Sequence, residues 1–203
     1  MNTHDDTIYT IVRAEKTDAP FIARTVMDAI GQELCINLAD GKENLPKVTE
    51  LFTRLGASEK SQYSYINTLI AKDVKGNPIG AIIGYDGADL VELRKEFIDA
   101  ANDLLGWNVT YEDAEKWQNE AAPDEFYLDS LFVMPSYRGK GVASALIRQI
   151  MKEKRHIGKP FGLLVEPENR NAKRLYQKLG FREIGISNFF STPMQHMQKQ
   201  LQG

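Results

Sequence analysis

The sequence predicts a mixed α/β domain in which helices flank one central β-sheet. Two observations favour this class: the first half of the chain contains a hairpin of two strands, and strand and helix patterns alternate through the second half. Of the 203 residues, 42% are hydrophobic, which is enough for a substantial core. We therefore expect residues 1–203 to form a single domain.

The chain is expected to begin with a strand over residues 8–13, where β-formers alternate in "IYTIVR". Asp18 and Pro20 then indicate the start of a helix that ends at Gly31. Residues 45–56 predict a second helix.

A hairpin follows, with strands over residues 65–73 and 78–85 and the turn "VKGNP" between them. Residues 86–122 interrupt the strand pattern. They contain two helical stretches rich in Asp and Glu, and Thr110 with Asp113 three positions later fits a helix N-cap. We therefore expect an acidic helical insertion between the third and fourth strands.

The second half predicts a strand over residues 126–133 and a helix over residues 141–155. Another strand ("KPFGLLVEP") and another helix ("NRNAKRLYQKLG") come next. The N-cap of that helix is Asn169 or Asn171, and Gly180 ends it. Two closing strands, "FREIGISNFF" and "PMQHMQKQL", complete the expected order.

Charge is unevenly distributed along the chain. Residues 1–135 contain 12 Lys and Arg against 24 Asp and Glu, whereas residues 136–182 contain 12 against 3. This asymmetry indicates either two kinds of ligand surface or simply solvated faces of opposite sign. The net charge of −3 does not favour a nucleic-acid partner.

Several classes of protein are disfavoured. No apolar run reaches membrane length, and the acidic N-terminus is unlike a signal peptide. The single cysteine, Cys35, excludes an intramolecular disulfide, fits a cytoplasmic location and is expected to be a small buried residue. His4, His156 and His196 are scattered, so no metal site is expected.

The stretch "PSYRGKGVASALI", residues 135–147, places a glycine-rich turn between a strand and a helix. This arrangement directs the unpaired amides of a helix N-terminus towards an anion. Gly139 and Gly141 permit close approach, and Arg138 and Lys140 add positive charge. The turn therefore predicts a phosphate site, with an ordinary tight turn as the alternative.

Two known phosphate-binding patterns do not fit this turn. A Walker A loop needs glycine where the chain has Met134 and Ser or Thr where it has Gly141. The dinucleotide fingerprint needs glycine where the chain has Ser144. A nucleotide-binding protein that uses this turn for ATP is therefore disfavoured.

Instead, Arg138-x-x-Gly141-x-Ala143 after "LFV" resembles the acyl-CoA signature of the GNAT superfamily of N-acyltransferases. The later stretch "NRNAKRLYQKLGF" is similar to the family pattern N-x-x-A-x-x-L-Y-x-x-x-G-F. The order of elements at both ends of the chain also agrees, whereas residues 86–122 depart because the family usually joins those strands more directly. The resemblance implies a GNAT-like central mixed sheet and an acetyl-CoA-dependent N-acetyltransferase.

The resemblance also implies which residues bind coenzyme A. The backbone amides of six residues in the turn would bind its pyrophosphate: Arg138, Gly139, Lys140, Gly141, Val142 and Ala143. The backbone of the preceding strand would pair with the pantetheine arm through Leu131, Phe132 and Val133. Asn169 would contact the cofactor, cap a helix, or do both.

For catalysis, the resemblance implies that Tyr176 protonates the leaving thiolate, and a core aromatic is the alternative reading of that residue. An alkyl amine with a pKa of roughly 10 must also lose a proton. Asp129 is our candidate base, with Glu33 and Glu125 as alternatives. Some relatives carry a catalytic glutamate at the position of Tyr127.

The strand alternation predicts that Tyr127, Asp129, Leu131 and Val133 share one face, which would place Asp129 near the cofactor. A backbone N–H near Val133 could then stabilise the oxyanion.

The sequence is compatible with several acceptors, several roles for the insertion and a second function. The acceptor is a primary amine of unspecified kind, from a protein N-terminus or lysine to a polyamine, antibiotic or small metabolite. The insertion could be a lid whose Asp99, Asp103 and Asp113 favour a cationic amine, a solvated helical surface, or a dimer contact through Trp107 and Trp117. The chain is expected to be a monomer or a homodimer, and a non-catalytic acyl-CoA sensor is the alternative function.

Overall fold

A computed structural model describes residues 9–189 and 192–201. Along the chain the elements are β1 Tyr9–Arg13, α1 Ala19–Ile30, α2 Gln32–Ala39, α3 Leu45–Ala57, β2 Thr68–Asp73, β3 Pro78–Asp86, α4 Leu90–Leu105, α5 Tyr111–Glu115, β4 Phe126–Val133, α6 Val142–Lys154, β5 Phe161–Val165, α7 Arg170–Lys178, β6 Arg182–Phe189 and β7 Thr192–Lys199.

The seven described strands form one mixed sheet in the order β1-β2-β3-β4-β5-β7-β6. Every pair of neighbours is antiparallel except β4 and β5, which run parallel. The crossover between these two strands contains α6, as a parallel connection requires. The predicted mixed α/β class with one central sheet is therefore confirmed.

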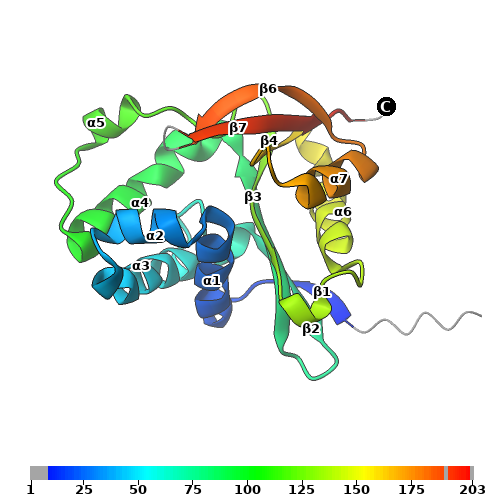
Figure 1. Cartoon of the computed structure of the whole chain (residues 1–203), viewed down its shortest axis with the longest axis horizontal. Coiled ribbons are helices and arrows are strands. Elements are labelled where there is room, and N and C mark those ends of the chain that lie inside the picture. Colours follow the sequence, from blue (N-terminus) through cyan, green and yellow to red (C-terminus); the bar gives the residue numbers. More distant parts are fainter. Residues whose placement is uncertain (1–8, 190–191, 202–203) are drawn as a thin grey trace, which may run out of the picture.

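Helices cover both faces of the sheet (Figure 1). On one face α1, α3 and α4 pack over a core that includes Ile70, Ala81 and Ile83. On the other face α6 packs over a core that includes Leu69 and Ile82. The β6–β7 hairpin lies across the end of the molecule next to α7. Each strand of the hairpin β2–β3 thus contributes alternate residues to two separate cores.

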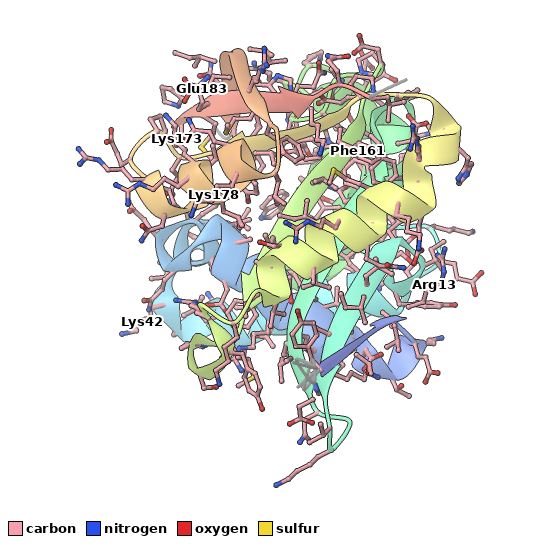
Figure 2. All side chains as sticks on the ribbon, turned by 90° about the vertical axis from the view of Figure 1, so that its right-hand side faces the viewer. Arg13, Lys42, Phe161, Lys173, Lys178 and Glu183 are labelled. Carbon is pink, nitrogen blue, oxygen red and sulfur yellow. The ribbon has the colours of Figure 1, made fainter. Side chains whose placement is uncertain are left out.

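Figure 2 looks onto the α6 and α7 face, where α6 crosses the sheet. Lys173 of α7 and Glu183 of β6 lie close together there, with a nitrogen–oxygen distance of 2.9 Å. Arg13 of β1 similarly pairs with Glu153 of α6 at 2.7 Å. Part of the basic charge on this side of the sheet is therefore used in surface ion pairs.

The local signals in the sequence are confirmed at several element ends. Gly31, at φ 83°, ends α1, and its N–H donates to Met27 O. Thr110 and Asp113 form the predicted capping box at the start of α5. The acidic segment contains two helices, α4 and α5, between β3 and β4. Ile8 and Phe190, at the ends of two predicted strands, lie outside the described residues.

Two helices differ from the prediction. We did not predict α2, although Leu34, Cys35 and Leu38 recur at helical spacing between two glycines. In contrast, α5 is only five residues long and does not extend over the whole predicted stretch. The chain leaves this helix before Glu120, which then reaches Arg94 of α4 in a buried ion pair. Tertiary contacts therefore override the local helical pattern there.

The prediction that four β4 residues share one face is wrong. The register to β3 shifts so that Ile83 opposes Ser130 and Gly84 opposes Leu128, which leaves Asp129 without an opposing residue. Such a β-bulge reverses the side-chain alternation beyond it. Tyr127 therefore packs with the α4 side, whereas Leu131 and Val133 pack with the α6 side.

The parallel pair β4–β5 separates soon after it begins. The strands pair only at Phe126 with Phe161 and at Tyr127 with Gly162, although β4 continues to Val133. The rest of β4 therefore has a paired edge towards β3 and, among the described residues, no strand on its other edge.

Candidate active site

The glycine turn has a backbone conformation that depends on its two glycines. Gly139 and Gly141 adopt positive φ angles of 75° and 82°, which non-glycine residues rarely adopt. A β-carbon at Gly139 would have no atom within 4 Å, and one at Gly141 would meet only Tyr9 Oη at 3.9 Å. The space beside both glycines is therefore open to a ligand.

The amides of this turn are available for hydrogen bonding. Within the described parts of the chain, the N–H groups of residues 139–143 donate to no protein acceptor. They stand at the N-terminus of α6, where the helix dipole favours an anion. Arg138 lies at the same place, and its Nε donates to Val133 O at 3.0 Å. Lys140 Nζ lies 5.0 Å from the centre of the Tyr137 ring.

The free edge of β4 also offers backbone groups. Met134 N donates to Ile79 O of β3 at 2.8 Å. Because successive N–H groups of a strand point to opposite edges, the N–H of Val133 points away from β3. Leu131 shares this orientation, while the ring of Phe132 packs on α1 against Phe21, with ring centres 6.1 Å apart.

Asp129 opens onto a cavity of about 510 Å³, which we call the Asp129 cavity. Its walls come from the α1–α2 junction, β4, the end of β5 and the β6–β7 hairpin. The lining residues are Ala29, Ile30, Gly31, Gln32, Glu33, Leu34, Asn37, Tyr63, Tyr127, Asp129, Ser130, Leu164, Glu166, Phe189, Thr192 and Met194. The β-bulge matters here because it places Asp129 on this side of the sheet.

The carboxyl group of Asp129 has an unusual environment. Burial raises its pKa from 3.8 to about 7, and the negative charge of Glu120 adds to the effect. The Ser130 hydroxyl donates to it at 2.7 Å and the Tyr85 hydroxyl at 3.0 Å, and both bonds oppose the rise. A carboxylate with a pKa near neutrality is suited to accept and release protons.

Three buried tyrosines surround this carboxyl group, and the sequence patterns predicted none of them as a site residue. Burial, followed by the negative charge of Asp129, raises the pKa of Tyr63, Tyr85 and Tyr127 well above 10. All three phenols therefore keep their protons at neutral pH. No local pattern could have indicated this cluster, because its members come from three separate segments of the chain.

The alternative bases differ in position. Glu33 lines the same cavity as Asp129. Glu125 does not, and it is fully buried. Its carboxylate accepts from Ala122 N at 3.0 Å and Gln198 Nε2 at 3.1 Å, and lies 2.9 Å from His196 Nε2. Glu125 therefore joins the start of β4 to β7, and its candidacy as a base is not supported.

Tyr176 lies on α7 among the residues that pack with the α6 core. Its ring makes an edge contact with Phe181, with centres 5.9 Å apart. Burial raises the pKa of the phenol to about 12. A second cavity, of about 540 Å³, adjoins the Asp129 cavity. Tyr176 lines neither of the two, so the structure brings Asp129 and Glu33 together but not Tyr176.

Two further predicted residues have clear structural roles. Asn169 is the N-cap of α7, and its Oδ1 accepts from Ala172 N at 3.1 Å. Cys35 is 2% exposed, and burial raises the pKa of its thiol. The prediction that Cys35 is a small buried residue is confirmed.

The acidic residues expected in a lid make contacts on the surface instead. Asp103 pairs with Arg54, Asp99 accepts from the Tyr111 hydroxyl, and Asp113 caps α5. None of the three lines the Asp129 cavity or the cavity next to it. Trp107 and Trp117, expected at a dimer contact, are half-buried and pack against the α1–α3–α4 core.

The described residues contain neither a metal-binding cluster nor a membrane-spanning helix. No group of three or more His, Cys, Asp or Glu side chains there could hold a metal ion. None of the described helices combines the length and the hydropathy that a membrane crossing needs.

The chain is similar to known acetyltransferases. A family model described as the Acetyltransferase (GNAT) family matches residues 42–181. The thialysine N-epsilon-acetyltransferase of Sus scrofa is 29% identical over 82 residues, and the corresponding Mus musculus protein is 28% identical over 82 residues. These matches cover 40% of the chain and 46% of each relative, so the matched stretch spans about half the length of the curated relatives.

Solved structures share the fold over nearly the whole chain. A structure described only as an acetyltransferase superposes with a TM-score of 0.73 at 24% identity, and covers 95% of this chain and 100% of its own. An N-acetyltransferase from Staphylococcus aureus superposes with a TM-score of 0.70 at 21% identity, covering 93% and 99%. At these identities the likeness concerns the fold.

Proposed function

Because the chain belongs to the GNAT acetyltransferase family, we propose that it transfers an acetyl group from acetyl-CoA to a primary amine by direct attack on the thioester. The observation that carries this proposal is Asp129, a carboxyl group with a pKa of about 7 in the wall of a cavity. The relatives named N-acetyltransferases support the amine as acceptor class.

The turn and the strand edge fit coenzyme A as the acyl carrier. The pyrophosphate would be held by the amides of residues 138–143, and those of 139–143 have no acceptor among the described residues. The open space beside Gly139 and Gly141 would admit its oxygens. The pantetheine arm would lie along the edge of Leu131, Phe132 and Val133. When bound, acetyl-CoA supplies the thioester carbonyl that the amine attacks.

The residues of the chain would divide the proton transfers between them. Asp129 takes the proton from the incoming ammonium group, directly or through water, because a neutral amine is the nucleophile. The N–H of Val133, free of β3, stabilises negative charge that develops on the carbonyl oxygen. Tyr176, which stays protonated at neutral pH, is proposed to deliver a proton to the leaving sulfur. The second proton, which the nitrogen loses as the amide forms, returns through water to Tyr176.

Calorimetric titration with acetyl-CoA, run beside ATP, tests the binding half of this proposal. We expect acetyl-CoA but not ATP to bind, and Gly141→Asp to abolish binding, because the new carboxylate would repel the pyrophosphate. Gly158→Asp is the matched control, since Gly158 also has a positive φ of 75° and open space around it but lies at the opposite end of α6, after the short 3-10 turn that follows the helix. If acetyl-CoA fails to bind the wild-type chain, the glycine turn is an ordinary tight turn with no role in cofactor binding.

Release of free thiol with primary amines tests the catalytic half. Transfer above the rate of thioester hydrolysis is expected with the wild-type chain and is expected to be lost in Asp129→Asn. Tight acetyl-CoA binding without transfer to any amine would instead favour the non-catalytic acyl-CoA sensor. We also propose that the protein acts in the cytoplasm, without a metal ion, as a monomer or homodimer.

A further inference from the structure

A second cavity, of about 540 Å³, lies beside the Asp129 cavity. We call it the Gln62 cavity. The two cavities share the lining residues Ile30, Tyr63 and Phe189, so they adjoin each other at these side chains. The other lining residues are Leu38, Phe52, Gln62, Arg94, Phe97, Trp107, Trp117, Gln118, Glu120 and Asn188. Six of these residues, from Arg94 to Glu120, belong to the acidic insertion, and of the six only Glu120 enters the proposed chemistry, through its charge beside Asp129.

Gln62 carries an unsatisfied buried acceptor in the wall of this cavity. The residue is 3% exposed, and its Oε1 has no hydrogen-bond partner among the described residues. Leaving a buried carbonyl unpaired is unfavourable, and such groups in native proteins usually have a partner. Gln62 Oε1 therefore needs a hydrogen-bond donor, and the described residues do not supply one.

The orientation of the Gln62 amide is fixed by its neighbour. Its Nε2 donates to Glu120 Oε1 at 3.4 Å, and a flipped amide would put two oxygens together. Glu120 is itself held by Arg94, at 2.6 Å, and lies 3.5 Å from the Tyr85 hydroxyl. Nε2 is thus used by Glu120, and Oε1 is left to accept a hydrogen bond from a ligand.

The remaining walls favour a flat apolar group. Phe52, Phe97, Trp107 and Trp117 supply aromatic surface, and Phe97 and Trp107 pack edge to face with centres 5.8 Å apart. The charges of Arg94 and Glu120 cancel as an ion pair. A full positive charge would lose its hydration close to Arg94, so a neutral donor suits the cavity better than a cationic one.

We propose that the Gln62 cavity binds the tail of the acceptor amine, and that this tail is an aromatic or apolar group carrying a neutral hydrogen-bond donor for Gln62 Oε1. The inference rests on the proposed function, because the reacting amine occupies the neighbouring Asp129 cavity. Asp129 then selects the reactive end of the substrate, and the insertion selects its tail.

The binding test uses tryptophan fluorescence, because the chain has two tryptophans and both line this cavity. The full chain is titrated with phenethylamine and with its 3- and 4-hydroxy derivatives. We expect a saturable change in emission, with one hydroxylated amine binding about tenfold more tightly than phenethylamine. In Gln62→Met the ratio of the two affinities should fall to about one. Tyr111→Phe, on the exposed surface of α5, should retain the tenfold ratio.

A kinetic test separates failure of this inference from failure of the proposed function. We expect kcat/KM for the preferred hydroxylated amine to fall about tenfold in Gln62→Met. The kcat/KM for methylamine, which is too short to leave the Asp129 cavity, should stay within twofold. Trp117→Leu removes part of the wall and should weaken all three aromatic amines while sparing methylamine, so the test does not depend on one variant folding.

Either of two results would overturn the inference: no change in tryptophan emission with any of these amines, or a preference for the hydroxyl group that survives Gln62→Met. If methylamine is acetylated in those cases, the proposed function stands and only the tail pocket is wrong. If the amines bind as expected but no thiol is released with any amine, the pocket stands and the proposed acetyl transfer is wrong.

Discussion

At the scale of single residues, the protonation of Asp129 sets the conditions under which the site can work. The carboxyl group is desolvated and lies near the negative charge of Glu120, so its pKa rises to about 7. Hydrogen bonds from Ser130 and Tyr85 limit the rise. As a base it must be deprotonated, so its contribution to the rate grows as the pH passes through about 7.

Asp129→Asn tests this role through kinetics. We expect kcat to fall by about 10²- to 10⁴-fold. The pH profile of kcat/KM should lose its rise near pH 7, because the amide does not titrate. An increase in kcat/KM with pH that comes from deprotonation of the free amine should persist in the variant. The variant profile therefore separates the titration of the amine from that of Asp129. A retained rise near pH 7 together with near-wild-type kcat would point to Glu33 as the base.

The same substitution should affect stability in the opposite direction. The carboxyl group has a pKa of about 7 when folded and about 3.9 when unfolded. Between these values the folded state binds more protons, so the free energy of unfolding falls as the pH rises from 4 to 7. We expect Asp129→Asn to unfold at a higher urea concentration than the wild type above pH 7, and this advantage to vanish near pH 4.

Gly162→Ala tests the buried position of Glu125. A β-carbon at Gly162 would overlap the fully buried Glu125 carboxylate. We expect the free energy of unfolding to fall by about 3 kcal/mol, measured by urea denaturation. Gly185→Ala is the control, because a β-carbon there meets nothing within 4 Å; equal losses in both variants would contradict this account.

At the scale of elements, α7 combines a structural cap with a proposed ligand contact in one side chain. Asn169 Oδ1 caps the nine-residue helix that carries Tyr176. An Asn N-cap contributes typically about 1 kcal/mol, and Ser caps nearly as well. The two roles of Asn169 can therefore be separated by choice of substitution.

We expect Asn169→Ala to lower the free energy of unfolding by about 1 kcal/mol and to weaken acetyl-CoA binding. Asn169→Ser should keep the stability but still weaken binding if the amide contacts the cofactor. Thermal unfolding and calorimetry measure the two effects. Asn171→Ala, in the same helix but without a capping bond, is the control; unchanged acetyl-CoA affinity in Asn169→Ser would leave Asn169 as a cap alone.

At the scale of the whole molecule, the Arg94–Glu120 ion pair ties the acidic insertion to the site. The two side chains are 7% and 9% exposed and lie 2.6 Å apart. Glu120 also accepts from Gln62, which precedes β2, and lies near the Tyr85 hydroxyl of β3. The insertion therefore reaches the sheet next to Asp129 through buried polar contacts.

Removing one partner of this ion pair should lower the free energy of unfolding substantially. We expect Arg94→Met to lower the free energy of unfolding by about 3–5 kcal/mol, because it leaves a buried carboxylate unpaired. Adding Glu120→Gln to that variant should recover part of the loss. Arg54→Met, which breaks an exposed pair with Asp103, should cost at most about 1 kcal/mol. Similar losses for Arg94→Met and Arg54→Met in urea denaturation would show that the insertion is not anchored this way.

The sequence by itself determined the features that depend on residues a few positions apart along the chain. The capping box at Thr110, a helix cap at Asn169 or Asn171 and the end of α1 at Gly31 were all predictable. Each depends on interactions within a few positions along the chain. The order of strands and helices and the family resemblance depend on the same local signals.

The tertiary structure alone decided the environment of the candidate base. The β-bulge at Asp129 is a matter of register between two strands, and strand alternation alone predicted the wrong face. Glu120 and Gln62 meet although they are 58 positions apart. Burial, pKa and cavity walls depend on which distant segments pack together, and a linear pattern carries no signal for that.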